Sequence, residues 1–215
     1  MKLNRRDKLL MIGDSITDCG RLRPVGEGKP EALGDGYVAL VDAMLRAARP
    51  DLQIRVVNMG ISGNTVRDLK ERWETDVMNL SPDWVSVMIG INDVWRQFDR
   101  PHIPERHVYP DEYEATLDEL VRRTLPHVKG MVLLTPFYIE PNRGDPMRAM
   151  MDRYGAIVRR TAERHGTMFA DTQAAFDRLL EHVYPAVLAP DRVHPYLTGH
   201  YVLARAFFAA LDFPF

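Results

Sequence analysis

The sequence contains very little cysteine, with one residue, Cys19, among 215. A single thiol cannot form a disulfide within the chain, so the disulfide framework typical of small secreted domains is excluded. Long apolar runs are also missing. The basic amino terminus is followed only by the apolar residues 9–12 before Gly13, which is too short for the core of a signal peptide or for a membrane span. These features predict a cytoplasmic protein.

An excess of charge of either sign is absent too. The 28 Lys and Arg residues nearly balance the 30 Asp and Glu residues, and no long block of one sign occurs, so binding to nucleic acid or to a membrane surface gains no support. No Gly-Lys-Ser/Thr run is present, and Gly26-Glu27-Gly28 does not continue into a dinucleotide-binding motif. His, Cys and carboxylate residues do not show the spacing of a zinc site. We therefore expect no cofactor and no metal.

The length and the 46% hydrophobic content predict one domain, residues 1–215. Short apolar runs that suit buried strands alternate with segments of helical periodicity, which indicates βαβ units, a parallel sheet and a three-layer α/β/α sandwich. The strands are expected at 8–12, 54–57, 84–89, 131–136 and 167–170. The helices are expected at 37–48, 65–81, 109–125, around 147–158, 172–183 and 198–211. Two connections, 20–36 and 99–110, lack periodicity and could serve as lids, rims or subunit contacts.

The stretch Gly13-Asp14-Ser15 follows the first expected strand, where a helix should begin. This position lies at the carboxyl edge of a parallel sheet, where ligands bind, so Ser15 is a candidate nucleophile whose own N–H faces a developing anion. A serine that only caps a helix is the structural alternative.

Two further polar stretches follow the second and third expected strands and therefore reach the same edge. Gly63, in the stretch 58–65, can bring a backbone N–H close to a reacting carbonyl, and Asn92, in the stretch 90–93, can offer its side-chain amide. Such donors stabilise the oxyanion of acyl transfer. Gly63 could instead only turn the chain, Asn92 could cap the next segment, and Ser62 is expected to be a cap or turn residue.

Near the carboxyl terminus, Asp191 and His194 are three residues apart and can reach one site from one loop. His194 would take the proton of Ser15 as a base and return it as an acid, while Asp191 would hold the imidazole tautomer. The other histidines lack this acidic neighbour and are expected to be structural. They are His102, His107, His127, His165, His182 and His200.

Substrate contacts are predicted at Asp14, Trp95 and Tyr138, because aromatic faces suit sugar rings and leave little room for a long acyl chain. Phe137 lies in the same region but is expected to pack beneath a loop. Arg96 could be a solvated charge on the rim of the site.

Taken together, these stretches resemble the SGNH hydrolases, the family of Gly-Asp-Ser-Leu esterases and lipases, with Ile16 in place of the leucine. The resemblance covers almost the whole chain in the family's order. It implies Ser15 as nucleophile, Asp191 and His194 as the rest of the triad, and an oxyanion hole from the Ser15 N–H, the Gly63 N–H and the Asn92 side chain. It also implies a flavodoxin-like five-stranded sheet in the order 2-1-3-4-5 and no metal.

The segments 13–21, 60–69 and 89–97 further resemble the small intracellular bacterial acetylxylan esterases of this family. That resemblance implies removal of acetyl groups from xylo-oligosaccharides and assembly into a homo-oligomer. A lysophospholipase or thioesterase of the same family is the alternative enzyme. A catalytically idle carbohydrate-binding protein on this fold is the alternative outside enzymes.

Overall fold

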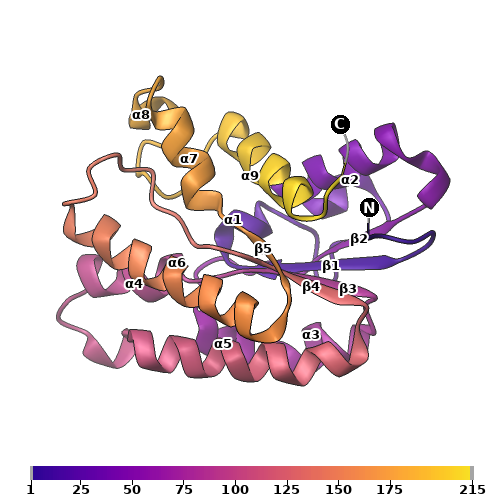
Figure 1. Ribbon diagram of the computed structural model, residues 1–215, viewed down its shortest axis with the longest axis horizontal. Helices are drawn as coiled ribbons and strands as arrows, with labels where there is room; N and C mark the ends of the chain where they lie inside the picture. Colours follow the sequence, from indigo (N-terminus) through magenta and orange to yellow (C-terminus); the bar gives the residue numbers. More distant parts are fainter. Residues whose placement is uncertain (1, 214–215) are drawn as a thin grey trace.

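The computed structural model describes residues 2–213, which form a five-stranded parallel sheet between two layers of helices (Figure 1). The strands are β1 (Lys8–Gly13), β2 (Arg55–Asn58), β3 (Trp84–Met88), β4 (Gly130–Leu134) and β5 (Met168–Ala170). All four pairings are parallel, and the sheet order is β2-β1-β3-β4-β5. The flavodoxin-like topology expected from the sequence is confirmed.

This strand order reverses direction between β1 and β3. The chain moves from β1 outward to β2 and then crosses back to β3 on the other side of β1. In open α/β sheets a crevice forms beyond the carboxyl ends of the strands at such a reversal, because neighbouring connections leave in opposite directions. The segments that follow β1, β2 and β3 therefore meet at one edge.

The helices cover both faces of the sheet. Figure 1 shows α2, α7, α8 and α9 on one face and α3, α4, α5 and α6 on the other. Their bounds are α1 (Ser15–Asp18), α2 (Tyr37–Ala48), α3 (Val66–Asp76), α4 (Ile91–Asp99), α5 (Pro110–Thr124), α6 (Pro146–His165), α7 (Thr172–Leu180), α8 (Pro185–Leu188) and α9 (Leu197–Ala210). None of the helices in residues 2–213 combines the length and apolar character needed to span a membrane.

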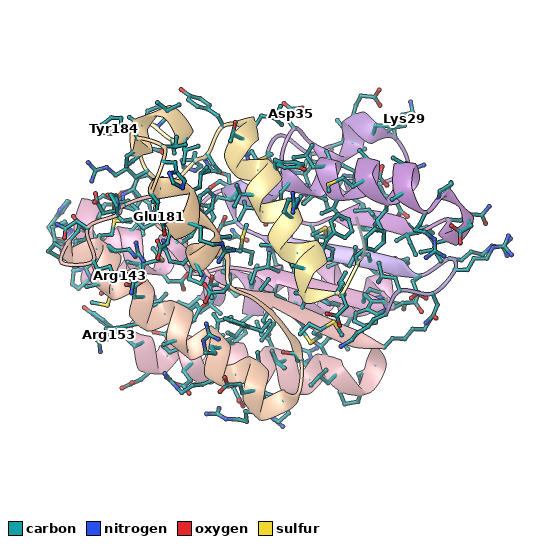
Figure 2. The ribbon with its side chains drawn as sticks, turned by 45° about the horizontal axis from the view of Figure 1, so that its top comes forward. Lys29, Asp35, Arg143, Arg153, Glu181 and Tyr184 are labelled. Atoms are coloured by element: carbon teal, nitrogen blue, oxygen red, sulfur yellow. The ribbon has the colours of Figure 1, made fainter. Side chains whose placement is uncertain are left out.

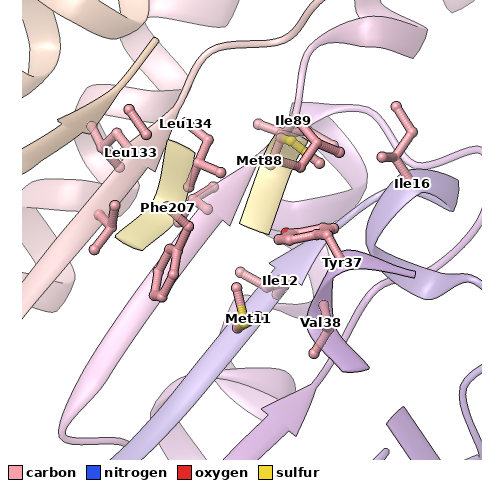
Figure 3. Packing of buried hydrophobic residues seen from close by; sticks show 14 of the residues in the cluster. Met11, Ile12, Ile16, Tyr37, Val38, Met88, Ile89, Leu133, Leu134 and Phe207 are labelled. Carbon is pink, nitrogen blue, oxygen red and sulfur yellow. The ribbon is translucent and has the colours of Figure 1, made fainter. Parts of the chain in front are cut away.

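The core lies on both faces of the central strands, which explains their continuous apolar runs. Residues 9–12 of β1 are fully buried. On one face, Tyr37 from α2 and Phe207 from α9 lie over β1, β3 and β4 (Figure 3), and both side chains are inaccessible to solvent. The helix stripe Met147, Met151, Tyr154 and Val158 is also buried, as its spacing predicts. This packing makes the sheet a rigid support for its carboxyl edge.

The expected elements agree with the structure within about three residues at most ends, apart from two short helices. The sequence reading missed α4, although Ile91, Val94, Trp95 and Phe98 have the spacing of one helical face, because the stretch has only nine residues and its polar pair Asn92 and Asp93 resembles a loop after the strand. It also missed α8, and the predicted loop 20–36 contains a short 3₁₀ turn at Pro30–Leu33.

Candidate active site

Ser15 lies directly after β1 at the carboxyl edge of the sheet. Gly13 ends the strand so close to β3 that a Cβ atom there would lie 2.3 Å from the carbonyl oxygen of Met88. Asp14 then caps α1, because its carboxylate accepts the backbone N–H of Ile16 at 3.0 Å. The capping residue is thus Asp14, and Ser15 is the first helical residue, with its hydroxyl available for chemistry.

Three side chains from opposite ends of the chain form a hydrogen-bonded series. Ser15 Oγ lies 2.8 Å from His194 Nε2, and His194 Nδ1 lies 2.6 Å from Asp191 Oδ2. A carboxylate can only accept, so Nδ1 carries the proton and Nε2 presents a lone pair to the serine hydroxyl. The arrangement has the geometry in which an imidazole can take a proton from a serine.

Asp191 is held in its ionised form. Burial by itself raises the pKa of Asp191, but hydrogen bonds from the His194 ring and from the backbone N–H groups of His194 and Val193 together lower it below the usual range. Asp191 Oδ1 accepts these two backbone N–H groups at 2.8 and 2.9 Å, which leaves Oδ2 for the ring. A fixed negative charge therefore faces the imidazole and stabilises its protonated form.

The loop that carries Asp191 and His194 is anchored to the segment after β4. The carbonyl oxygen of Arg192 accepts the N–H of Ile139 at 2.9 Å, and the Arg192 guanidinium pairs with Glu140. This anchor brings the carboxyl-terminal loop over the sheet edge. Sequence reasoning missed Arg192 and Glu140, since no motif links their positions.

Two backbone N–H groups that follow strand ends at this edge of the sheet are the predicted oxyanion donors. Within residues 2–213, neither the N–H of Ser15 nor that of Gly63 donates to a protein acceptor. Gly63 has φ +83°, which glycine adopts without strain, but no protein atom lies within 4 Å of a Cβ built there. The backbone conformation therefore favours glycine at position 63, and the approach of its N–H to a substrate carbonyl stays a prediction.

Asn92 supplies the third candidate donor. It lies in the first turn of α4 and is 2% exposed, and its Nδ2 donates to the carbonyl oxygen of Asn64 at 3.0 Å. One of the two Nδ2 hydrogens therefore stays available. Gly90 is the N-cap of α4, so the alternative interpretation of Asn92 as a cap is wrong.

Arg72 fixes the loop that carries Gly63 against the end of β1. Its guanidinium donates to the carbonyl oxygens of Gly13 at 3.0 Å and Met59 at 2.7 Å, and to Asn64 Oδ1 at 2.7 Å. One side chain thus connects the segments that follow β1 and β2. Sequence reasoning used only the apolar face of this helix and missed Arg72.

Of the predicted substrate contacts, Trp95 lies beside the triad. Its ring meets the His194 ring edge to face, with the centroids 5.9 Å apart. Tyr138 is half-buried after β4 and shares a side-chain hydrogen bond with Arg192. Within residues 2–213 it makes no hydrogen bond to Ser15, Asp191 or His194, so its predicted contact with substrate stays a prediction.

The remaining candidates near the site are buried. Asp14 is 1% exposed, and its helix-capping bond gives it a structural role in place of the expected substrate contact. Phe137 is fully buried against Phe176, with ring centroids 4.4 Å apart, so it packs in the core as expected.

A cavity of about 430 Å³ is lined by Gly63, one of the predicted oxyanion donors. Its lining is almost entirely polar or charged: Gly63, Thr65, Arg67, Asp68, Glu71, Arg96, Arg100, Glu105 and Arg106. A lining of this kind suits a polyhydroxylated ligand better than a long hydrocarbon chain. No cluster of His, Cys, Asp or Glu side chains in the described part of the chain has the form of a metal site.

The single cysteine does not compete with Ser15 as a nucleophile. Burial raises the pKa of the Cys19 thiol to about 12, and three nearby carboxylates add to this. The thiolate, which is the reactive form, is therefore scarce at neutral pH.

Two buried carboxyl groups lie beneath the site. Burial raises the pKa of Asp14 and the pKa of Asp93 to about 7. The charge of His194 lowers the pKa of Asp14 in part, whereas the charge of Asp14 adds to the rise at Asp93. Asp93 Oδ1 accepts the N–H of Val66 at 2.9 Å, whereas Oδ2 has no partner. Ionisation of Asp93 therefore costs stability.

We expect the stability of Asp93→Asn to increase relative to that of the parent protein as pH rises. In the native state Asp93 keeps its proton up to about pH 7, while in the unfolded chain it loses it near its ordinary pKa. As pH rises from the ordinary carboxyl pKa to about 7, the parent protein therefore loses stability on the order of a few kcal/mol. The variant does not, because asparagine does not titrate. Thermal unfolding of both proteins at pH 5 and pH 8 measures this. A melting-temperature difference that stays constant with pH would contradict it.

A parallel sheet of this order, with serine, imidazole and carboxylate in series at its carboxyl edge, defines a serine hydrolase of the α/β/α type. The chain belongs to the GDSL-like lipase/acylhydrolase family, whose model matches residues 11–202. The resemblance stated from the sequence motifs is confirmed. The chain is an ester hydrolase, so the alternative of an idle carbohydrate-binding protein is wrong.

Similar proteins of known structure share this fold over their full length. The chain is 62% identical to the acetylxylan esterase of Geobacillus stearothermophilus, and the match covers 99% of this chain and 97% of that protein. Crystal structures of that enzyme's catalytic mutants S15A, H194A and D191A match this chain with TM-scores of 0.98, 0.99 and 0.98. Each match covers 100% of this chain and 98% of the chain in the crystal structure. LAE5, an α/β hydrolase from the metagenome of Lake Arreo, is 60% identical, with coverages of 99% and 98% and a TM-score of 0.97.

Proposed function

We propose that this chain removes acetyl groups from acetylated xylo-oligosaccharides, with Ser15 as nucleophile, His194 as acid and base, and Asp191 as the partner of His194. The observation that carries the proposal is the continuous series of hydrogen bonds from Ser15 Oγ through the imidazole to the Asp191 carboxylate. The acetylxylan esterase of Geobacillus stearothermophilus supports the proposal, because its variants S15A, H194A and D191A are described as catalytic mutants.

In the first half of the reaction, Ser15 Oγ attacks the ester carbonyl carbon while its proton passes to His194 Nε2. The carbonyl oxygen becomes an oxyanion, which accepts hydrogen bonds from the N–H groups of Ser15 and Gly63 and from Asn92 Nδ2. When the intermediate collapses, the bond to the sugar oxygen breaks and that oxygen takes the proton from His194. The acyl group remains on Ser15.

In the second half, water replaces the sugar. His194 takes a proton from the water as its oxygen attacks the acyl carbon, and the same donors hold the new oxyanion. The acyl bond to Ser15 Oγ then breaks, His194 returns the proton to that oxygen, and acetate leaves. Asp191 keeps its negative charge throughout and stabilises each imidazolium.

The substrate class rests on similarity and on the shape of the site. The relative from Geobacillus stearothermophilus is an acetylxylan esterase, described also as an acetyl-xylooligosaccharide esterase. Trp95 lies beside His194 and is partly exposed, so it can contact a sugar ring, and the neighbouring cavity is lined by polar groups. These features favour a sugar alcohol and a small acyl group over a lysophospholipid or a long-chain thioester.

A series of nitrophenyl esters tests the acyl preference. We expect kcat/KM to be highest for acetate and to fall by about tenfold or more at eight carbons, because a long chain would have to lie against charged side chains. Acetate release from acetylated xylotriose, followed by mass spectrometry, gives the matched test of the alcohol side. A preference for eight carbons or more would favour the lysophospholipase or thioesterase alternative.

We further propose that residues 1–215 act as one catalytic domain in a homo-oligomer in the cytoplasm. The site draws Ser15 and His194 from opposite ends of the chain, which supports one domain. Large apolar side chains are exposed on α8 and at the start of α9, among them Tyr184 at 73% and Leu197 at 64%, and Tyr184 projects outward in Figure 2. Sedimentation equilibrium gives the mass of the assembly, and a monomer would refute the oligomer.

A further inference from the structure

Arg96 contacts the proposed oxyanion donor Asn92 on the oxygen side of its amide. It lies one turn after Asn92 on α4, and its Nη2 donates to Asn92 Oδ1 at 3.0 Å. We propose that Arg96 is a positioning residue that fixes which end of the Asn92 amide faces the oxyanion. The inference rests on the proposed function, because it gives Arg96 a role only if Asn92 serves as an oxyanion donor.

The two contacts of the Asn92 amide permit only one orientation. The carbonyl oxygen of Asn64 can only accept, and it receives a hydrogen from Asn92 Nδ2, while the Arg96 guanidinium can only donate, and it donates to Oδ1. A flipped amide would place two acceptors together at Asn64 and two donors together at Arg96. Its oxygen would then face the developing oxyanion, where it would repel charge.

Arg96 is held firmly enough to impose this choice. Its guanidinium pairs with Asp99 one turn further along α4 and lies over the Trp95 ring, 4.6 Å from the centroid. Only 19% of its side chain is exposed to solvent. A partly desolvated guanidinium makes a charge-assisted hydrogen bond, which polarises the amide and strengthens Nδ2 as a donor. The interpretation of Arg96 as a solvated rim charge is thereby replaced.

The role predicts an effect on kcat more than on KM, because the amide is needed most when the oxyanion has formed. We expect Arg96→Ala to lower kcat for acetyl esters by about tenfold and to leave KM within about twofold. Arg96→Met, which keeps an unbranched aliphatic side chain but lacks the guanidinium, should show the same loss. Thermal unfolding of both variants establishes that they are folded.

The matched control is Arg153→Ala, which removes the same charge from an exposed position on α6, outside the cavity beside Gly63. Within residues 2–213 the Arg153 side chain makes no hydrogen bond and no ion pair. We expect its kcat to stay within about twofold of the parent. An equal loss in Arg153→Ala and Arg96→Ala would show a general charge effect and overturn the proposal.

A double-mutant cycle with Asn92→Ala decides the mechanism. Asn92→Ala alone should lower kcat by about 100-fold, and Arg96→Ala should cost nothing more in that background, because the amide it orients is gone. Binding of a trifluoromethyl ketone, which forms a tetrahedral oxyanion on serine, should weaken in parallel. Additive losses, or an unchanged kcat in Arg96→Ala, would overturn the role of Arg96. An unchanged kcat in Asn92→Ala would instead overturn the oxyanion assignment in the proposed function.

Discussion

Ser15→Ala is expected to lower kcat for acetyl esters by about 10⁴-fold or more and to leave the fold intact. In the proposed mechanism the variant lacks the oxygen that forms the acyl-enzyme, and the proposed donors could then act only on a direct attack by water. Its structural cost is small, because the Ser15 hydroxyl makes one side-chain hydrogen bond, to His194, and alanine is well suited to a helical position. Hydrolysis of 4-nitrophenyl acetate and thermal unfolding measure both effects.

Ser62→Ala provides the matched control. Ser62 lies in the neighbouring turn, is exposed, and its hydroxyl has no recorded partner in the described part of the chain. Its kcat should stay within about twofold of the parent, since neither the triad nor the backbone donors change. A serine-directed phosphonate should label the parent and Ser62→Ala but not Ser15→Ala. Turnover or labelling retained in Ser15→Ala would remove Ser15 from the mechanism.

The convergence at the sheet edge could be predicted because parallel strands all end on the same side. Once residues 8–12, 54–57 and 84–89 are assigned as parallel strands, Ser15, Gly63 and Asn92 must all lie at the same edge of the sheet, although the pattern alone does not make the three strands neighbours. The structure has this arrangement, with β1 paired to both β2 and β3. Chain topology therefore supplied this part of the site, and the motif resemblance supplied the strand order.

The residues that hold the donors could not be predicted in the same way. Arg72 reaches three acceptors on two other segments, and nothing in local sequence indicates that a charged helical residue points inward. Arg96 depends on α4, a helix of nine residues that follows β3 almost directly and is too short to be recognised from its apolar spacing alone. Had α4 been recognised, the four-residue spacing from Asn92 would have indicated the contact. Positioning residues depend on tertiary geometry, whereas reacting residues occur in motifs.

The contacts that anchor the carboxyl-terminal loop could not be predicted from local sequence either. The spacing of Asp191 and His194 predicts their mutual contact, but their approach to Ser15 is a tertiary contact, with His194 Nε2 2.8 Å from Ser15 Oγ. The Arg192–Glu140 ion pair and the hydrogen bond from the Ile139 N–H to the Arg192 carbonyl oxygen join this loop to the segment after β4. Both contacts connect segments that are far apart in sequence, and no local motif indicates them.

Asp191→Asn is expected to lower kcat by about 10³- to 10⁴-fold although its shape is nearly that of the parent. The asparagine oxygen can still accept the backbone N–H groups of Val193 and His194, as Asp191 Oδ1 does at 2.9 and 2.8 Å, so the loop keeps its form. Its NH₂ group then faces His194 Nδ1, where the carboxylate stood. A donor at Nδ1 favours the tautomer with the proton on Nε2, and that nitrogen cannot accept the proton of Ser15.

The chain offers its own control in a second histidine and aspartate pair. His165 Nε2 lies 2.8 Å from Asp118 Oδ1, between α6 and α5 and away from the sheet edge. Asp118→Asn makes the same chemical change there, and we expect its kcat to stay within about twofold of the parent. The KM of Asp191→Asn should also change little, because the donors and Trp95 are untouched. Activity in Asp191→Asn close to that of Asp118→Asn would show that the ionised carboxylate does not set the imidazole tautomer, and His194 would then need another partner.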